Sequence, residues 1–255
     1  MEFLVTNDDG IQARGILTLA LELAKIGKVT IIAPDREQSA TGHGITVHHP
    51  LRVQKMTLAD NITAYAVDGT PSDCVKLGLQ AILPKKPTMV VSGINRGANL
   101  GTDVLYSGTV SAAGEGTMHG VPSFAVSVVT DEDGPYDFAA QLARRVAVQI
   151  NEKGLPPGVL LNINVPPLPV EKIAGLKITK LGIRRYQNVF DKRIDPRGRT
   201  YYWLAGEVVD VDTGEESDTK ANQANYVTIT PIHFDLTDYE FLKELKGWRL
   251  SLEDN

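Results

Sequence analysis

The stretch Phe3-Leu4-Val5-Thr6-Asn7-Asp8-Asp9-Gly10 decides the fold of this chain. Three apolar residues run into an amide and two adjacent carboxylates, and a helical pattern follows. A short apolar run of this kind indicates the first buried strand of a parallel sheet, with the acidic pair at its carboxyl end. Because open α/β sheets form their binding sites at that end, we expect a functional site to begin at Asp8 and Asp9.

The two adjacent carboxylates also need a physical explanation. Asp8 and Asp9 repel each other, and burying either one without compensation is costly, which favours a bound cation. Oxygen ligands of this kind suit magnesium, manganese or calcium better than zinc. The dipeptide alone is equally compatible with a helix cap at one of the aspartates and a turn at Asn7.

The residues after this stretch predict a repeating α/β pattern. Apolar side chains recur at helical spacing through residues 11–26, Gly27 ends the helix, and residues 29–33 form a β-branched strand. This βαβ unit implies a parallel sheet with a right-handed crossover. Further strands are expected at residues 45–47, 62–67, 88–92, 123–128 and 159–165. Further helices are expected from Thr70, with a capping box to Asp73, from Ser107, and over residues 136–151. Residues 93–106 read as a long glycine-rich loop.

The pattern changes after residues 166–167. Residues 176–181, 201–209 and 226–232 read as strands without intervening helices, and a final helix is expected to start in the segment Asp235-Leu236-Thr237-Asp238. These strands do not easily join a parallel sheet. We therefore expect a catalytic core over residues 1–168 and a β-rich appendage over residues 169–255, of a kind that often exchanges between subunits. The appendage carries a basic patch, interpreted as a solvated or subunit-contacting face: Arg184, Arg185, Lys192, Arg193, Arg197 and Arg199.

Composition limits the possible partners. The formal net charge of −5 over 255 residues argues against binding to a nucleic-acid duplex, which needs a basic surface. The single cysteine, Cys74, excludes an intramolecular disulfide, and no apolar run reaches the length of a membrane span. Met1 leads directly into the first expected strand, leaving no room for a signal peptide. We expect a cytoplasmic protein without a membrane partner.

Polar clusters follow three of the predicted parallel strands, at residues 7–9, 35–39 and 92–95. Adjacent strands would bring these clusters into one crevice. Asp8, Asp9, Ser39 and Asn95 would then supply two charged and two neutral oxygen ligands, the coordination typical of magnesium. Ser39 by itself would be taken for an ordinary loop serine.

A fourth cluster, Tyr106-Ser107-Gly108-Thr109, lies at a predicted helix start. Free amides, hydroxyls and the helix dipole together make an anion site suited to phosphate, although an ordinary helix cap is the simpler interpretation. A divalent cation beside a phosphate cradle indicates phosphoryl-ester chemistry, in which the metal polarises phosphoryl oxygens and lowers the pKa of water.

These motifs together resemble the SurE family of survival-protein nucleotidases, in the family's order and spacing and over nearly the whole chain. The matching segments are Asn7-Asp8-Asp9-Gly10, Ala33-Pro34-Asp35-Arg36 with Ser39, Gly69-Thr70-Pro71-Ser72-Asp73-Cys74-Val75, Ser92-Gly93-Ile94-Asn95, Asn99-Leu100-Gly101, Tyr106-Ser107-Gly108-Thr109-Val110 and Asp235-Leu236-Thr237.

The resemblance implies a Rossmann-like three-layer core with a parallel sheet, and a C-terminal β-rich region with a terminal helix that is exchanged between subunits of a dimer or tetramer. It implies a phosphatase that uses one Mg²⁺ or Mn²⁺ ion per subunit to hydrolyse nucleoside 5′- and 3′-monophosphates, and sometimes short polyphosphate. The implied metal ligands are Asp8, Asp9, Ser39 and Asn95, the implied catalytic residues are Asp8, Asp9 and Asn95, and the implied phosphate-binding residues are Asn95, Ser107, Gly108 and Thr109.

Two positions depart from the family pattern. Arg14 replaces a usual proline, and His43 occupies a variable position; both are expected at the mouth of the site. His43 is a candidate general acid, although a solvated loop histidine is the simpler interpretation.

Other classes of protein fit the sequence less well. A dinucleotide-binding oxidoreductase would need a G-x-G-x-x-G turn, which residues 6–15 lack. A serine hydrolase would need a G-x-S-x-G elbow with a histidine partner. A non-catalytic metal-dependent nucleotide sensor remains the alternative, because placement of the reacting groups to within an ångström decides turnover.

Overall fold

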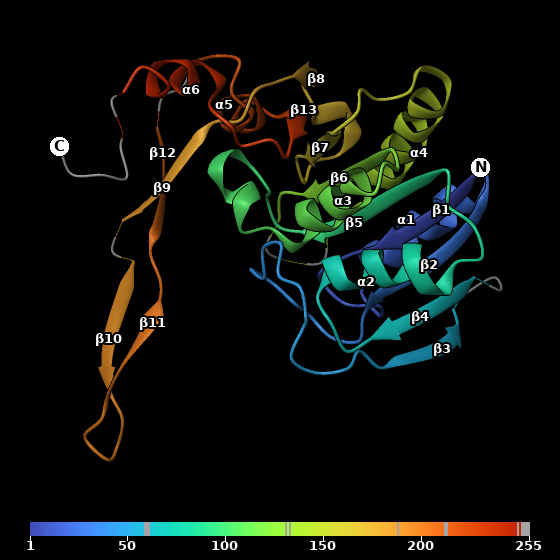
Figure 1. Ribbon diagram of the computed structural model, residues 1–255, viewed down its shortest axis with the longest axis horizontal. Helices are drawn as coiled ribbons and strands as arrows, with labels where there is room; N and C mark the ends of the chain where they lie inside the picture. Colours follow the sequence, from blue (N-terminus) through green and yellow to red (C-terminus); the bar gives the residue numbers. More distant parts are fainter. Residues whose placement is uncertain are drawn as a thin grey trace.

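A nine-stranded sheet forms the middle layer of the molecule, with strand order β3-β4-β2-β1-β5-β6-β7-β13-β8 (Figure 1). The computed structural model describes residues 1–58, 62–130, 132, 134–187, 189–211, 214–248 and 250. From β4 to β7 neighbouring strands run parallel. The strands of this sheet are β1 (Glu2–Thr6), β2 (Lys28–Pro34), β3 (Val53–Thr57), β4 (Thr63–Val67), β5 (Met89–Arg96), β6 (Ser123–Val128), β7 (Val159–Val165), β8 (Gly175–Ile178) and β13 (Tyr226–His233).

Helices cover both faces of the sheet, so the core has three layers (Figure 1). Alternate residues of β1 point to opposite faces: Phe3 and Val5 pack in the cluster of α1 and α4, and Leu4 packs in the cluster of α2 and α3. The predicted α/β class, with a mostly parallel sheet, is confirmed. The helices are α1 (Arg14–Ala24), α2 (Pro71–Leu77), α3 (Gly108–Met118), α4 (Tyr136–Lys153), α5 (Asp218–Gln223) and α6 (Tyr239–Leu245).

The local signals for helix starts are confirmed at two positions. Thr70 caps α2 in a full capping box, in which its hydroxyl accepts from the Asp73 amide at 3.1 Å and Asp73 accepts from the Thr70 amide at 2.9 Å. The terminal helix α6 starts at the end of the expected segment Asp235-Leu236-Thr237-Asp238, with Asp238 as its cap.

Two predictions in the core are wrong. Residues 45–47 form no strand, and the strand before β4 is instead β3, which pairs antiparallel with it. β3 is a largely exposed edge strand held by backbone pairing, so its sequence carries little apolar signal. Residues 93–96 belong to β5 rather than to a loop, with a shift of register between Ser92 and Asn95. At Gly93 the backbone passes so close to the Val126 carbonyl that a Cβ would overlap it, so this shift of register requires glycine.

The C-terminal strands divide between the sheet and a projection from it. The expectation that they could not join the sheet is wrong for β13 and β8, because β13 runs antiparallel to β7 and then pairs parallel with β8. The expected boundary after residue 168 therefore does not coincide with an edge of the sheet. The expected strand at residues 201–209 is two strands, β11 and β12, and α5 has no counterpart among the predicted elements.

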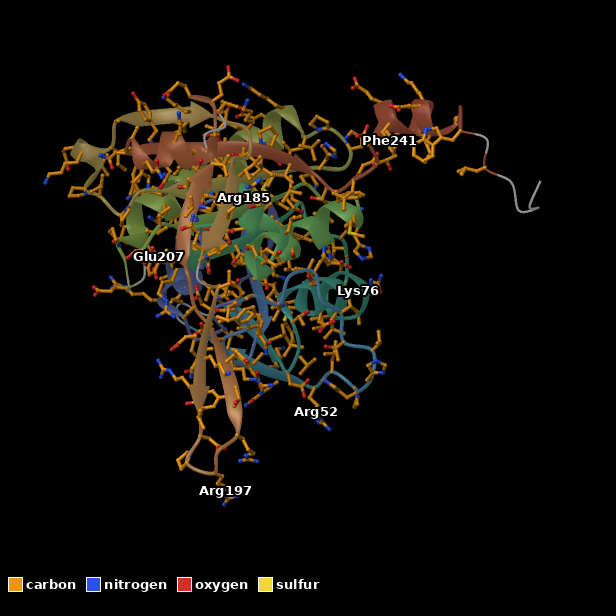
Figure 2. All side chains as sticks on the ribbon, turned by 90° about the vertical axis from the view of Figure 1, so that its left-hand side faces the viewer. Arg52, Lys76, Arg185, Arg197, Glu207 and Phe241 are labelled. Atoms are coloured by element: carbon orange, nitrogen blue, oxygen red, sulfur yellow. The ribbon has the colours of Figure 1, made fainter. Side chains whose placement is uncertain are left out.

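The remaining strands form an extended arm, defined here as residues 183–211. β9 (Ile183–Gln187) pairs with β12 (Glu207–Val211), and β10 (Phe190–Ile194) pairs with β11 (Thr200–Leu204), both antiparallel. Figure 2 shows Arg197 at the far end of the arm and Phe241 on α6, both standing away from the sheet. Every residue of β10 and β11 is exposed, so neither strand contributes to the core.

Close packing of α1 on β5 generates a stability prediction. A Cβ at Gly15 would overlap the carbonyl oxygen of Ile94, which is backbone and cannot move aside. Gly15→Ala should therefore lower the free energy of unfolding by about 2 kcal/mol, despite the better helix propensity of alanine. Urea unfolding followed by circular dichroism measures this change.

Gly114→Ala in α3 is the matched control. Its Cβ would meet nothing closer than the His43 ring at 3.7 Å, an ordinary contact. This variant should be neutral or stabilised by up to about 1 kcal/mol. Equal stability changes in both variants would contradict the packing that we describe at Gly15.

Candidate active site

The turn after β1 delivers Asp8 to the carboxyl edge of the sheet. Asn7 Nδ2 donates to the Gly10 carbonyl at 2.9 Å, closing the turn, and Ile11 N donates to the Pro34 carbonyl at 2.8 Å. Gly10 has φ 96°, and a Cβ there would lie 3.0 Å from the Arg36 backbone. The turn therefore packs directly against the loop that follows β2.

Asp8 is buried and is held by the start of α3. The Thr109 hydroxyl donates to Asp8 Oδ1, and the Thr109 amide donates to Asp8 Oδ2 at 3.1 Å. A Cβ at Gly108 would lie 2.9 Å from Asp8 Cβ, so only glycine allows this approach. Burial, opposed by the Thr109 bonds and helped by the neighbouring Asp9 charge, raises the pKa of Asp8 to about 6.

The end of β5 places Asn95 and Arg96 beside this carboxylate pair. Asn95 is buried, and its Nδ2 donates to the Gly97 carbonyl at 2.9 Å. Asp9 Oδ2 accepts from the Arg96 amide at 3.0 Å. The backbone of β5 thus fixes the orientation of Asp9, while the Asn95 side chain faces a cavity.

That cavity has a volume of about 250 Å³ and brings together four of the predicted site residues. Asp8, Ser39, Asn95 and Ser107 line it. Asp9, Gly108 and Thr109 lie outside the lining, and both donors of Thr109 are turned to Asp8. The other lining residues are Ala40, Arg96, Gly97, Ala98, Asn99, Asp103, Tyr106 and Tyr186.

The donor atoms at this edge of the sheet fit a hard divalent cation. Asp8 and Asp9 offer carboxylates, and Ser39 and Asn95 offer neutral oxygens. Asn7 Oδ1 is buried nearby without a hydrogen-bond partner among the described residues. Within the same part of the chain, no group of three or more His, Cys, Asp or Glu side chains is placed to hold a metal.

The loop that carries Ser39 is tied to both sides of the cavity. Gln38 N donates to the Asp8 carbonyl at 2.8 Å, and Gly42 N donates to the Tyr106 carbonyl at 3.0 Å. The exposed Ser39 hydroxyl donates to Glu37 Oε1 at 2.7 Å. Backbone bonds therefore position the loop, while the Ser39 side chain stays accessible.

His43 anchors the end of this loop on α3. Its Nε2 lies 2.7 Å from Glu115 Oε2, and Glu115 also contacts Lys76 at 3.2 Å and His119 at 3.0 Å. His43 is an exposed loop residue, as expected, but its ring is paired with Glu115 and it does not line the cavity. Arg14 is exposed at the first residue of α1 and also lies outside the lining, and the expected place of both residues at the mouth stays a prediction.

The C-terminal region supplies site residues that the sequence did not indicate. Tyr186, on the arm, lines the cavity, and its hydroxyl donates to Asp103 Oδ2 at 2.8 Å. Arg184 donates to the same oxygen at 3.1 Å and to Asp210 at 2.9 Å. Its interpretation as a solvated residue is wrong, because its side chain is only 15% exposed, and subunit contact stays a prediction. No local pattern could reveal these pairings.

The comparisons with known proteins agree with this architecture. The family model described as "Survival protein SurE" matches residues 3–188. The chain belongs to the SurE family. The SurE protein of Aquifex aeolicus, a solved structure, superposes with a TM-score of 0.83 at 41% identity, over 96% of this chain and 98% of that one.

Two curated SurE relatives are similar over nearly their full length. The protein named 5′-nucleotidase SurE from Heliobacterium modesticaldum is 56% identical, covering 97% of this chain and 92% of that protein. The protein of the same name from Moorella thermoacetica is 53% identical, covering 97% of this chain and 96% of that protein. Among the residues described here, this SurE chain has no helix long and apolar enough to cross a membrane.

The buried Glu115 generates a prediction about pH. Chiefly through the bond from His43, its surroundings lower the pKa of Glu115 to about 2. A carboxyl whose pKa is lower in the folded than in the unfolded protein stabilises the fold at pH values above its unfolded pKa. This stability is lost as the pH falls from about 4.5 towards 2. Glu115→Gln should cost about 1–3 kcal/mol at pH 7 and flatten the loss of stability below pH 4.5, measured by urea unfolding.

Glu152→Gln, at an exposed position near the end of α4, is the control and should change neither the stability at pH 7 nor its pH dependence. The same acid dependence in Glu115→Gln and the unmodified protein would refute the role given to this carboxylate.

Proposed function

We propose that this SurE-family chain is a divalent-metal-dependent phosphomonoesterase that hydrolyses nucleoside 5′- and 3′-monophosphates, and also short-chain polyphosphate. The observation that carries the proposal is that Asp8 and Ser107, the cap of α3, line one cavity, with Asp8 bonded to the first turn of α3 through Thr109. The 5′-nucleotidase names of the relatives support the same hydrolase class.

The residues divide into a cation-binding side and a phosphate-binding side. Asp8, Asp9, Ser39 and Asn95 would hold one Mg²⁺ or Mn²⁺ ion per subunit, which when bound would neutralise charge on the phosphoryl oxygens. On the opposite side α3 begins at Gly108 with Ser107 as its cap, so its first turn presents a positive dipole end to an anion.

The phosphate would be held by Asn95, Ser107 and Gly108. Ser107 accepts from the Val110 amide at 3.0 Å, which orients its hydroxyl group at the cavity wall. Direct phosphate binding by Thr109 stays a prediction. With both of its donors on Asp8, Thr109 fixes the spacing between the carboxylate and the helix N-terminus.

Hydrolysis requires a water oxygen to bond to phosphorus as the ester P–O bond breaks. One carboxylate of the Asp8–Asp9 pair would accept the proton of the attacking water, and the leaving nucleoside oxygen would take its proton from solvent. Fixed donors around the phosphate would keep the attack in line. The competing function, a nucleotide sensor without turnover, would retain the binding groups but release the ligand unchanged.

Phosphate release from nucleoside 5′- and 3′-monophosphates, assayed with EDTA and then with Mg²⁺ or Mn²⁺ restored, tests the activity. We expect release to stop with EDTA and to return with the ion, because the carboxylate pair requires a counter-charge to approach a phosphate. Binding of nucleotide with no release under any condition would identify the sensor instead.

Asp8→Asn and Asp9→Asn should each abolish this release while leaving the fold intact, because removing one of two repelling charges does not weaken the metal-free protein. Asp137→Asn, at an exposed position in the first turn of α4, is the control and should keep normal turnover. Full activity in either site variant would refute the assignment of these ligands.

We further propose that the chain self-associates as a dimer or tetramer through its C-terminal region, and that it resides in the cytoplasm. Exposed apolar side chains on the arm and around α6 support association, because monomers rarely expose so many together. They are Phe190, Tyr202, Trp203 and Leu204 on the arm, and Leu236, Phe241, Leu242 and Trp248 around α6.

Replacing Trp203 and Leu204 together by serine should lower the molar mass in solution, measured by light scattering after gel filtration, because it removes apolar surface from the interface. Replacing Val170, which is exposed outside the arm, is the control and should leave the mass unchanged. A monomer for the unmodified protein at micromolar concentration would end this proposal.

A further inference from the structure

The cavity has two chemically different parts. Asp8, Asn95 and Ser107 supply the charged and polar groups assigned above to the cation and the phosphate. Tyr106 and Tyr186 contribute aromatic rings to the same lining. Tyr106 is 66% exposed and Tyr186 is 43% exposed, so neither ring is buried in the core. Both rings are therefore available to a ligand.

Tyr186 is held in place by a network at the root of the arm. Its hydroxyl donates to Asp103 Oδ2, which also receives Arg184. Thr102 Oγ1 donates to the Arg184 carbonyl at 2.9 Å and accepts from its amide at 3.1 Å. Arg184, Asp103 and Asp210 are each 15–17% exposed, so solvent screens these ion pairs only weakly. The ring is thus oriented before a ligand arrives, which lowers the cost of binding.

Asp103 has remaining capacity to accept hydrogen bonds. Both side-chain donors that reach it among the described residues fall on Oδ2. An ionised carboxylate offers about four lone-pair sites on its two oxygens. Because Asp103 also lines the cavity, its other oxygen can accept from hydroxyl groups of a ligand.

We propose that Tyr106, Tyr186 and Asp103 bind the nucleoside half of the substrate, with the base against the tyrosine rings and the ribose hydroxyls on the Asp103 carboxylate. This proposal rests on the proposed nucleotidase function and names the groups that select a nucleotide over other phosphomonoesters. A flat base stacks on aromatic rings regardless of its identity, so the wall recognises a base as such and tolerates different bases.

The test compares two substrates that differ only in the base, a nucleoside 5′-monophosphate and ribose 5-phosphate. In the unmodified protein kcat/KM should favour the nucleotide. Tyr186→Ala should reduce this preference by about tenfold, mainly through a higher KM for the nucleotide, with ribose 5-phosphate little affected. Tyr186→Phe keeps the ring and should retain most of the preference.

The ratio of the two kcat/KM values does not depend on the fraction of folded enzyme, so partial misfolding cannot imitate the effect. Tyr201→Ala is the matched control, because Tyr201 lies on β11 of the same arm, is 41% exposed and does not line the cavity. It should leave the preference unchanged. An unchanged preference in Tyr186→Ala would overturn the proposal.

Failure of the proposed function gives a different result. If the unmodified protein releases phosphate from neither substrate, calorimetric titration of both compounds in the presence of Mg²⁺ replaces the kinetic assay. Tighter binding of the nucleotide that weakens about tenfold in Tyr186→Ala would still support the nucleoside-binding wall. Equal affinities of the unmodified protein and Tyr186→Ala for the nucleotide would overturn it.

Discussion

The hydrogen bonds from Thr109 to the buried Asp8 carboxylate are the interaction on which the site depends. They join the end of β1 to the start of α3, two elements separated by a hundred residues of chain. Burial disfavours the charged carboxylate, and the helix N-terminus and the Thr109 hydroxyl partly compensate for this cost. Gly108 makes the contact possible, since any side chain there would strike Asp8.

A second buried carboxylate fastens the C-terminal region to this centre. Asp218 accepts from the Gly101 amide at 2.9 Å and from the Gly182 amide at 2.7 Å, which ties the short helical turn Gly101–Leu105 to the root of the arm. Both Asp103 and Tyr186 are positioned by this attachment. The region after residue 168 therefore shapes the cavity as well as extending the sheet.

Much of the core was predictable because its signals are local. The apolar run of β1, the helical spacing of α1, and the capping box of α2 are each contained within a few residues. β3 was missed, and β8 and β13 were expected as strands but not as members of the sheet, because these features depend on pairing with distant strands. An edge strand such as β3 is stabilised by backbone hydrogen bonds, which leave little trace in side-chain composition.

The sequence by itself determined the kinds of oxygen donor and their order at the carboxyl ends of successive strands, because apolar runs and the polar residues that follow them are read along the chain. Only the tertiary structure decided that Thr109 turns both donors to Asp8, that His43 pairs with Glu115, and that Tyr186 reaches Asp103 across 83 positions of sequence. Such contacts form only when packing brings together residues that are far apart in the sequence, so no rule based on sequence spacing predicts them.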